Sequence, residues 1–377
     1  MIRVGLVVDE FFGGWRTAIG GFGFLAREFV AKYIPNEDIS IDVLLNRWGN
    51  LWFARKKVID GITLYKLPRS TYCAKRWLAH KNYDIYLSIE MSTDVLELEE
   101  NPDKKMILWV QAPIPQYVWE NVIAQMQSIT DHSFYNQKLY DLVHQWSENG
   151  KVIFATQGRS LNQLAIDLYR LDPSTEMQYL PNPIDIDFTY YISGKRNSVV
   201  FLGRLAAIKR AWLFCEIAKR MPDIDFYVLG KIQSYQQENS AMLQPYMDGT
   251  IPNLHCLGHQ EGAMKRKYLR EAKVLVSTSI WEGIPISWLE ALSYGTLIVS
   301  CLNKEGLPER FGKYVGEIQG DGFDDVERFV PAIRELLTDD EQYYRKAEAA
   351  ITYIRETHSI ANFQQAMRKL IIENVPR

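Results

Sequence analysis

Short apolar runs alternate with helical patterns along the chain. Apolar runs that predict buried strands occupy residues 3–8, 40–45, 85–89, 106–110 and 152–155 of the first half, and 198–202, 225–229, 274–277 and 297–300 of the second. Patterns with the period of an amphipathic helix lie between them, for example at 22–33 and 161–169. This alternation is typical of parallel sheets covered by helices. The sequence therefore predicts an α/β fold.

Length and a break in the pattern predict two domains. The chain has 377 residues, which is enough for two α/β domains that each have a core. The periodicity stops over residues 188–197, where tyrosine, serine, glycine and lysine replace the apolar spacing. We therefore expect one domain over residues 1–187 and a second over residues 188–359.

Two carboxylates flank the start of a predicted helix in the second half. Glu282 follows the apolar run 274–277, Gly283 and Pro285 open the helix, and Glu290 lies inside it. The first N–H groups of a helix are unpaired and attract anions. At ~1.5 Å per residue, Glu290 lies about 9 Å further along, which is roughly the reach from a diphosphate to its ribose. A carboxylate also accepts two hydrogen bonds from a vicinal diol. Taken alone, the pair fits an ordinary turn acid and a solvated helix residue better than a binding site.

A basic element follows an earlier predicted strand. The apolar run 198–202 leads into Gly203, Arg204 and Leu205, and Lys209 comes shortly after. An arginine can bind a pyrophosphate through two hydrogen bonds, and a lysine can act as a point charge beside it. The basic and acidic elements together indicate a site for a nucleoside diphosphate that carries a sugar.

These residues resemble the retaining nucleotide-sugar glycosyltransferases of the GT-B fold, family 4. That family shows a strand ending in G-R-L with a lysine several residues on, and later the pattern E-G-x-x-x-x-x-x-E. The resemblance is strongest over about residues 180–300, and it extends to the segments L-P-N-P-I-D at 180–185, N-L-H-C-L-G at 253–258 and G-G-F-G at 20–23. It covers little of residues 45–180.

The resemblance implies two Rossmann-like domains whose parallel sheets face each other across a cleft. Residues 1–187 would bind the acceptor, residues 188–359 would bind the nucleotide sugar, and a C-terminal helix over 360–377 would pack back onto the first domain. The implied reaction moves a hexose from a nucleoside diphosphate sugar to a hydroxyl of a sugar or lipid-linked saccharide, with retention at the anomeric carbon. On family frequency we expect a UDP-hexose such as UDP-glucose, and a role in surface or exopolysaccharide synthesis.

The resemblance also assigns roles to residues. Arg204 and Lys209 would stabilise the departing diphosphate, Glu282 would bind donor-sugar hydroxyls, and Glu290 would bind the ribose diol. Further donor contacts would come from Gly20, Gly21, Gly203, Gly258, Gly283, Ile284, Ile286 and Ser287. Many family members place a histidine after a central strand of the first domain, where this chain has Gln111, so Gln111 is the candidate on the acceptor side. The sequence contains no convincing D-x-D pair for a divalent ion. Since basic side chains can stabilise the departing diphosphate in place of a metal ion, we expect neither a metal nor a cofactor.

Three alternatives stay open at this stage. A catalytically silent copy would bind a nucleotide sugar as a partner subunit without transferring it. A related epimerase or phosphorylase would share the architecture. A dinucleotide-dependent oxidoreductase is suggested by Gly21-x-Gly23-x-x-Ala26 with Asp42 downstream. That fingerprint requires the turn to follow its strand at once, and residues 9–19 intervene here.

Charge and composition narrow the partners. A formal net charge of −3 and a pI near 6.1 argue against a nucleic-acid-binding protein. The four cysteines lack metal-ligand spacing. The N-terminus resembles a strand more than a signal peptide, and no apolar run is long enough to span a membrane, so we expect a cytoplasmic protein. Residues 55–81 combine many lysines and arginines with aromatic side chains. Such a stretch is mostly a solvated face, and the alternative is peripheral contact with an anionic membrane at its inner face or with a lipid-diphosphate acceptor.

Overall fold

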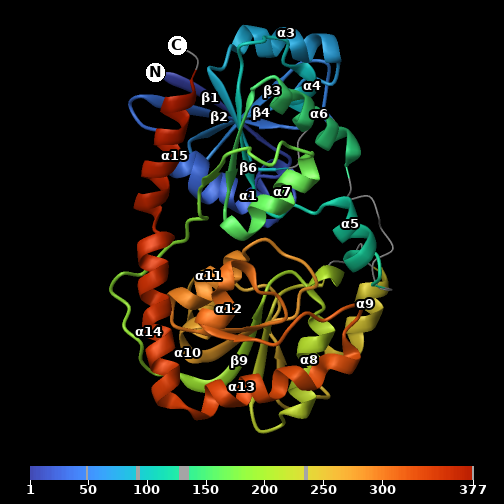
Figure 1. Cartoon of the computed structure of the whole chain (residues 1–377), viewed down its shortest axis with the longest axis vertical. Helices are drawn as coiled ribbons and strands as arrows, with labels where there is room; N and C mark the ends of the chain where they lie inside the picture. The colour runs from blue at the N-terminus through green and yellow to red at the C-terminus, as the bar shows by residue number, and fades with distance from the viewer. Residues whose placement is uncertain (48–49, 91–93, 127–135, 233–236, 376–377) are drawn as a thin grey trace. The chain divides into compact units, whose positions relative to one another are not determined.

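The computed structural model describes residues 1–47, 50–90, 94–126, 136–232 and 237–375. The chain forms two compact units. Unit 1 comprises Met1–Pro115, Asn136–Pro183 and Ile360–Arg377, and unit 2 comprises Gln116–Tyr135 and Ile184–Ser359. Each unit is an α/β layer structure built around one sheet (Figure 1). Among the described residues, no helix has both the length and the apolar character needed to cross a membrane.

The described part of unit 1 contains a sheet of eight strands in the order β3-β4-β2-β1-β5-β6-β7-β8. Every neighbouring pair is parallel except β3 and β4, which form an antiparallel hairpin at one edge. The strands are β1 (Ile2–Val8), β2 (Ile39–Leu45), β3 (Arg55–Ile59), β4 (Ile62–Lys66), β5 (Ile85–Ser88), β6 (Met106–Val110), β7 (Val152–Thr156) and β8 (Met177–Tyr179). The sequence prediction missed β3, β4 and β8, because β3 and β4 are polar edge strands and β8 is very short.

The helices of unit 1 pack against this sheet. They are α1 (Gly21–Phe24), α2 (Ala31–Tyr33), α3 (Thr71–Lys81), α4 (Asp94–Leu98), α6 (Gln137–Glu148), α7 (Asn162–Tyr169) and α15 (Ile360–Asn374). A π-helical stretch, Leu25–Val30, joins α1 to α2, so the helix predicted over 22–33 is continuous but locally widened. The C-terminal α15 lies beside the first helices (Figure 1), and Arg368 donates hydrogen bonds to the carbonyls of Tyr33 and Ile34.

The described part of unit 2 contains a fully parallel sheet of six strands in the order β11-β10-β9-β12-β13-β14. These are β9 (Arg196–Leu202), β10 (Asp225–Leu229), β11 (Leu254–Cys256), β12 (Ala272–Ser277), β13 (Leu297–Ser300) and β14 (Gly312–Tyr314). All six residues of β12 are buried, as expected for a central strand with both faces covered.

Helices surround this second sheet (Figure 1). They are α5 (Gln116–Val118), α8 (Ala211–Arg220), α9 (Gln237–Leu243), α10 (Gly262–Glu271), α11 (Ile286–Ser293), α12 (Leu307–Arg310), α13 (Phe329–Thr338) and α14 (Asp340–Thr357).

The units divide the chain differently from the expected boundary at 187/188. Ile184 is buried in the core of unit 2 and donates a backbone hydrogen bond to the carbonyl of His358, at 3.0 Å. The carboxylate of Asp187 accepts from Arg270 of α10, at 2.6 Å. These contacts attach the linker to unit 2, so the division falls after Pro183. The segment from Gln116 also lies outside unit 1, because Met126 packs into the core of unit 2.

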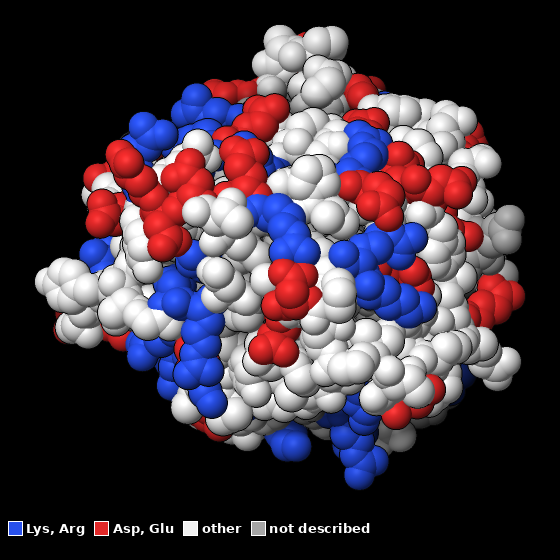
Figure 2. All heavy atoms as spheres, turned by 90° about the horizontal axis from the view of Figure 1, so that it is seen from below, with Lys and Arg blue, Asp and Glu red and all other residues white. Residues whose placement is uncertain are grey.

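Surface charge in Figure 2 is mixed. Lysines and arginines stand next to aspartates and glutamates, in small groups of both signs. Ion pairs of unit 2 are of this kind, such as Arg220 with Glu327 at 2.6 Å and Arg334 with Asp223 at 2.5 Å. Nucleic-acid sites need a continuous basic patch, and the described part of this face carries none.

Candidate functional site

The sheet of unit 2 reverses its strand order between β9 and β12. The chain runs outward from β9 to β11 on one side and from β12 to β14 on the other. In open parallel sheets, ligands bind outside the carboxyl ends of the strands at such a point. Arg204 follows the end of β9, and Glu282 follows the end of β12. The fold therefore brings the basic and the acidic elements of the sequence to one edge of one sheet.

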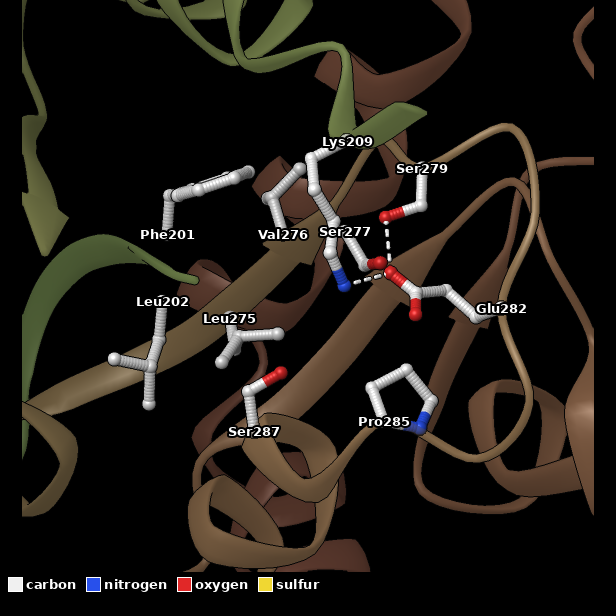
Figure 3. A pocket seen from close by; sticks show the side chains of 10 residues that line it. All are labelled: Phe201, Leu202, Lys209, Leu275, Val276, Ser277, Ser279, Glu282, Pro285 and Ser287. Atoms are coloured by element: carbon white, nitrogen blue, oxygen red, sulfur yellow. Dashed lines mark hydrogen bonds and ion pairs between the residues drawn. The ribbon is translucent and has the colours of Figure 1, made fainter. Parts of the chain in front are cut away.

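An ion pair joins two of the residues predicted from the sequence. The Lys209 ammonium, in a 3-10 turn over Ala207–Lys209, pairs with the Glu282 carboxylate across a sequence separation of 73 residues. The hydroxyl of Ser279 donates to the same carboxylate at 2.8 Å. Figure 3 shows these side chains at a small pocket that is also lined by Phe201, Leu202, Leu275, Val276, Ser277, Pro285 and Ser287. The side chains of Lys209 and Glu282 are 21% and 15% exposed, so both remain accessible from the solvent.

Helix α11 begins at this pocket. Pro285 is its N-cap, and the N–H of Trp288 bonds back to the Pro285 carbonyl at 3.0 Å. The first N–H groups of a helix, here those of Ile286 and Ser287, have no acceptor within the helix and carry partial positive charge. Gly283 and Ile284 are buried in the turn that precedes it. The pocket thus combines an ammonium, a helix start and a carboxylate.

Arg204 is exposed, on a loop whose course depends on a close approach of two backbones. The N–H of Gly203 bonds to the Leu229 carbonyl, and that of Leu205 to the Lys231 carbonyl, each at 3.1 Å. A Cβ on Gly230 would overlap the carbonyl oxygen of Gly203. Gly230 therefore allows the exit of β9 to pass over the end of β10. The sequence analysis missed Gly230, because an isolated glycine after a strand carries no distinctive signal.

Glu290 of α11 forms an ion pair with a residue of the neighbouring helix. Its carboxylate forms an ion pair with Lys265 of α10, at 2.7 Å, and both side chains are about one fifth exposed. The predicted contact with a ribose diol would share or replace this pair. Lys265 could not be paired with Glu290 from the sequence, since only packing of α10 beside α11 brings them together.

Arg210, next to Lys209, is fully buried. Its guanidinium donates to the carbonyls of Thr278, Ile318 and Gly320, each at 2.8 Å, without any carboxylate partner within hydrogen-bond distance among the described residues. Burial lowers the pKa of this guanidinium. It ties together the segments that follow β12 and β14, and so it positions the loop that carries Ser279 and Glu282.

Lys304 follows the end of β13 and was also missed by the sequence analysis. Its ammonium lies 4.0 Å from the centroid of the Trp281 ring, and Trp281 directly precedes Glu282. Burial lowers the pKa of Lys304 to about 8, while the nearby carboxylates of Glu282 and Glu317 act in the opposite direction.

The glycine-rich loop of unit 1 is occupied by one of the protein's own carboxylates. Glu10 accepts a hydrogen bond from the N–H of Gly23 at 2.8 Å, and a Cβ on Gly20 would overlap its carboxylate. A donor phosphate at Gly20 and Gly21, as predicted from the sequence, would have to displace the Glu10 carboxylate or bind beside it. Gly21 itself has open space around its Cα.

Gln111 is buried rather than lining an open surface. Its side chain is 2% exposed, and its carbonyl oxygen accepts from Asn182 at 3.0 Å. Asn182 also donates to Gln157, at 2.6 Å. Beside this amide cluster, the carboxylate of Glu90 accepts from the N–H groups of Gln111 and Ala112, both at 2.9 Å. Gln111 was the predicted acceptor-side residue, but its side chain is buried and hydrogen-bonded within unit 1, so it does not lie on an open surface.

The remaining predicted positions have simpler surroundings. Gly258 lies exposed after β11 with a φ of 68°, a backbone conformation that favours glycine. Asn253, in the same segment, is structural, since its amide donates to three carbonyls of the turn before β10. Among the described residues, no group of three or more His, Cys, Asp or Glu side chains is arranged to hold a metal ion.

Comparison with known proteins agrees with this geometry. Residues 185–356 match the family model "Glycosyl transferases group 1". An uncharacterized glycosyltransferase of Methanocaldococcus jannaschii is 27% identical over 217 residues, which are 54% of this chain and 49% of that protein. The chain therefore spans about half the length of this curated relative.

Solved structures extend the likeness to the whole chain. Sucrose-phosphate synthase of Thermosynechococcus elongatus has a TM-score of 0.74 at 12% identity, covering 99% of each chain. HepE of Anabaena, solved with UDP, has a TM-score of 0.71 at 12% identity, covering 99% of this chain and 100% of that one. Residues 185–356 thus form a group 1 glycosyl transferase domain, and the chain has the GT-B fold. The glycosyltransferase domain and the GT-B fold recognised from the sequence are confirmed.

Proposed function

We propose that the protein is a retaining glycosyltransferase that moves a hexose from a nucleoside diphosphate sugar to a hydroxyl of a saccharide or a lipid-linked saccharide. The observation that carries this proposal is the meeting of Lys209, Glu282 and the start of α11 at the strand-order reversal of unit 2. A diphosphate needs cations and N–H donors, and a sugar needs a carboxylate that accepts from its hydroxyls.

The chemical step depends on the charge that develops on the departing diphosphate. Arg204 and Lys209 would face that charge, and the N–H groups of Ile286 and Ser287 would add hydrogen bonds. Donors fixed in place before the reaction stabilise such a transition state, and each is typically worth about 3–4 kcal/mol. Because the leaving group is stabilised by side chains and a helix start, we propose that the reaction needs no metal ion.

Glu282 would have two states in this scheme. In the structure its carboxylate pairs with Lys209 and accepts from Ser279. A bound donor would draw the Lys209 ammonium toward phosphate oxygens, and the carboxylate would then accept from hydroxyls of the sugar. Glu290 would similarly exchange Lys265 for the ribose diol.

A uridine diphosphate hexose, such as UDP-glucose, is the donor that we propose. Two proteins of the same fold support this choice: HepE of Anabaena was solved with UDP and glucose, and TarM of S. aureus with UDP. We propose surface or exopolysaccharide synthesis as the context, with a saccharide acceptor.

Several cations of residues 55–81, where we expected the membrane contact, already have partners. Within that range, Lys75 pairs with Glu100 at 2.6 Å, and Lys81 donates to the Tyr65 hydroxyl at 2.7 Å. The segment before and along β3 is different. Leu51, Trp52 and Phe53 are 49%, 74% and 63% exposed, and after Ala54 the chain continues with the exposed Arg55, Lys56 and Lys57. We propose that this 51–57 segment touches the anionic inner face of a membrane, because aromatic and basic side chains together suit a lipid interface.

Release of nucleoside diphosphate from a panel of nucleotide sugars, with and without saccharide acceptors, tests the proposed reaction. We expect turnover that depends on an acceptor and persists in EDTA. Arg204→Ala and Lys209→Ala should each lower kcat by about 100-fold or more, because each removes a charge from the leaving-group site. Lys219→Ala is the matched control, since Lys219 of α8 pairs with Glu216 away from this site.

Three outcomes would contradict the proposal. Binding of a nucleotide sugar without transfer or hydrolysis would indicate a silent partner subunit. Conversion of the donor without an acceptor, or only with inorganic phosphate, would indicate an epimerase or a phosphorylase. Activity lost in EDTA and restored by manganese would disprove metal independence.

A further inference from the structure

A third cation stands beside Glu282, at the end of the next strand. After β13 the chain makes a 3-10 turn over Lys304–Gly306 before α12. Lys304 is half-buried and holds its ammonium 4.0 Å from the centroid of the Trp281 ring. Because β12 lies between β9 and β13 in the sheet, Lys304 approaches the turn of Glu282 from the side opposite to Lys209.

The N–H groups of the Lys304 ammonium have no hydrogen-bond acceptor in the part of the chain that the structure describes. Among the described residues, its ammonium makes no hydrogen bond or ion pair, although the carboxylates of Glu282 and Glu317 are near enough to act on it electrostatically. The indole N–H of Trp281 is likewise buried without an acceptor in the described chain. A partly desolvated cation without an oxygen partner costs free energy, and the face of an indole ring offsets only part of that cost.

A structural explanation of Lys304 is therefore weak. A lysine that serves only to cover apolar surface keeps its ammonium in water. Here the ammonium is drawn onto a ring at the carboxyl edge of the sheet, where burial lowers its pKa to about 8. Other half-buried lysines of unit 2 have oxygen partners: Lys209 has Glu282, and Lys265 has Glu290.

We propose that Lys304 is a donor-binding residue whose ammonium, held on Trp281, binds an anionic oxygen of the nucleoside diphosphate. This inference rests on the proposed function and adds a cation that the sequence motifs do not contain. Arg204, Lys209 and Lys304 would then reach the diphosphate from the ends of β9 and β13, on either side of the Glu282 turn. Trp281 would hold the ammonium at the site before the donor arrives.

Calorimetric titration of the full chain tests this role. The wild-type protein is first titrated with UDP, GDP and ADP. The variants are then titrated with the diphosphate that binds best and with the matching nucleoside, which lacks the phosphates. Lys304→Met should lower the affinity for the nucleoside diphosphate by about 10-fold or more, because a charge-assisted contact is lost. The affinity for the nucleoside should stay unchanged. Lys313→Met is the matched control, since Lys313 of β14 pairs with Glu335.

A second readout separates binding from a structural role. Without nucleotide, Lys304→Met should keep or raise Tm, because it removes a desolvated charge that has no oxygen partner. A variant with a lowered Tm and wild-type diphosphate affinity would show that Lys304 is structural, and equal affinity by itself overturns the inference. If the wild-type protein binds none of the three diphosphates, the proposed function itself fails, and the two failures are thus distinguishable.

Discussion

Several charged side chains of this protein lie where strands end, and their surroundings decide what each can do. Lys209 and Glu282 pair with each other, Arg210 is enclosed by carbonyls, and Lys304 lies on a ring. The sequence around these residues does not distinguish their environments. Lys209 and Arg210 are adjacent, yet one lines a pocket and the other is fully buried. At this scale, chemistry follows from contacts rather than from residue type.

Glu90 gives a prediction that depends on pH. It is 6% exposed, and burial raises the pKa of its carboxyl to about 7, although hydrogen bonds from Ala112 and Gln111 oppose that shift. Between its unfolded pKa of about 4.5 and the folded value, the folded state keeps a proton that the unfolded state has released. Stability therefore falls as the pH rises through this window. Glu90→Gln removes the ionisation and should stabilise the protein by about 1–3 kcal/mol at pH 8, and by less at pH 5.

Urea unfolding at pH 5 and pH 8 measures this difference. Glu37→Gln is the control, because Glu37 is an exposed acid of the same unit. A gain for Glu90→Gln that is the same at both pH values would show that its carboxyl does not titrate in this range.

At the scale of elements, periodicity predicted the central strands well and the edges poorly. Strands β6 and β12 are buried along their whole length and were recognised as apolar runs. Strand β3 is exposed along most of its length, and its hairpin partner β4 is mixed, so neither shows a period that marks a strand. The turn after β12 was recognised because glycine and proline mark a helix start.

Gly230 gives a prediction about these elements. Gly230→Ala would press a Cβ against the Gly203 carbonyl and shift the loop that carries Arg204. We expect a loss of about 1–3 kcal/mol in stability and a clear fall in nucleotide affinity, measured by unfolding and by calorimetry. Gly21→Ala is the control for stability alone, since nothing lies within 4 Å of its added Cβ. Wild-type affinity in Gly230→Ala would mean that the position of this loop does not matter for binding.

At the scale of the whole molecule, the chain divides into two units that are each built on one sheet. The division falls after Pro183 rather than after residue 187 because Ile184 and Asp187 are bound to unit 2. The comparisons confirm a glycosyltransferase domain over residues 185–356 and the fold of the whole chain. The 51–57 segment belongs to unit 1, whereas the proposed nucleotide site belongs to unit 2, so membrane contact would be a property of the other unit.

Vesicle flotation tests that contact. The full chain should associate with vesicles that contain anionic lipids at low salt and dissociate as salt rises, because the basic side chains are screened. Trp52→Ser with Phe53→Ser should reduce association by about 10-fold or more. Tyr191→Ser is the matched control, since Tyr191 of unit 2 is 81% exposed. Association that is absent at low salt, or unchanged in the double variant, would rule out this surface.

The sequence by itself determined the α/β class, the glycosyltransferase domain of residues 185–356 and the expectation that the basic and acidic elements share one site. It could do so because parallel strands place their carboxyl ends on one edge, so that motifs after strands converge whatever lies between them. Only the tertiary structure decided that Glu290 pairs with Lys265, that Gln111 is buried, that Glu10 fills the glycine loop, and that Lys304 lies on Trp281. These outcomes depend on which elements pack side by side, and no local period or spacing encodes a contact between distant side chains.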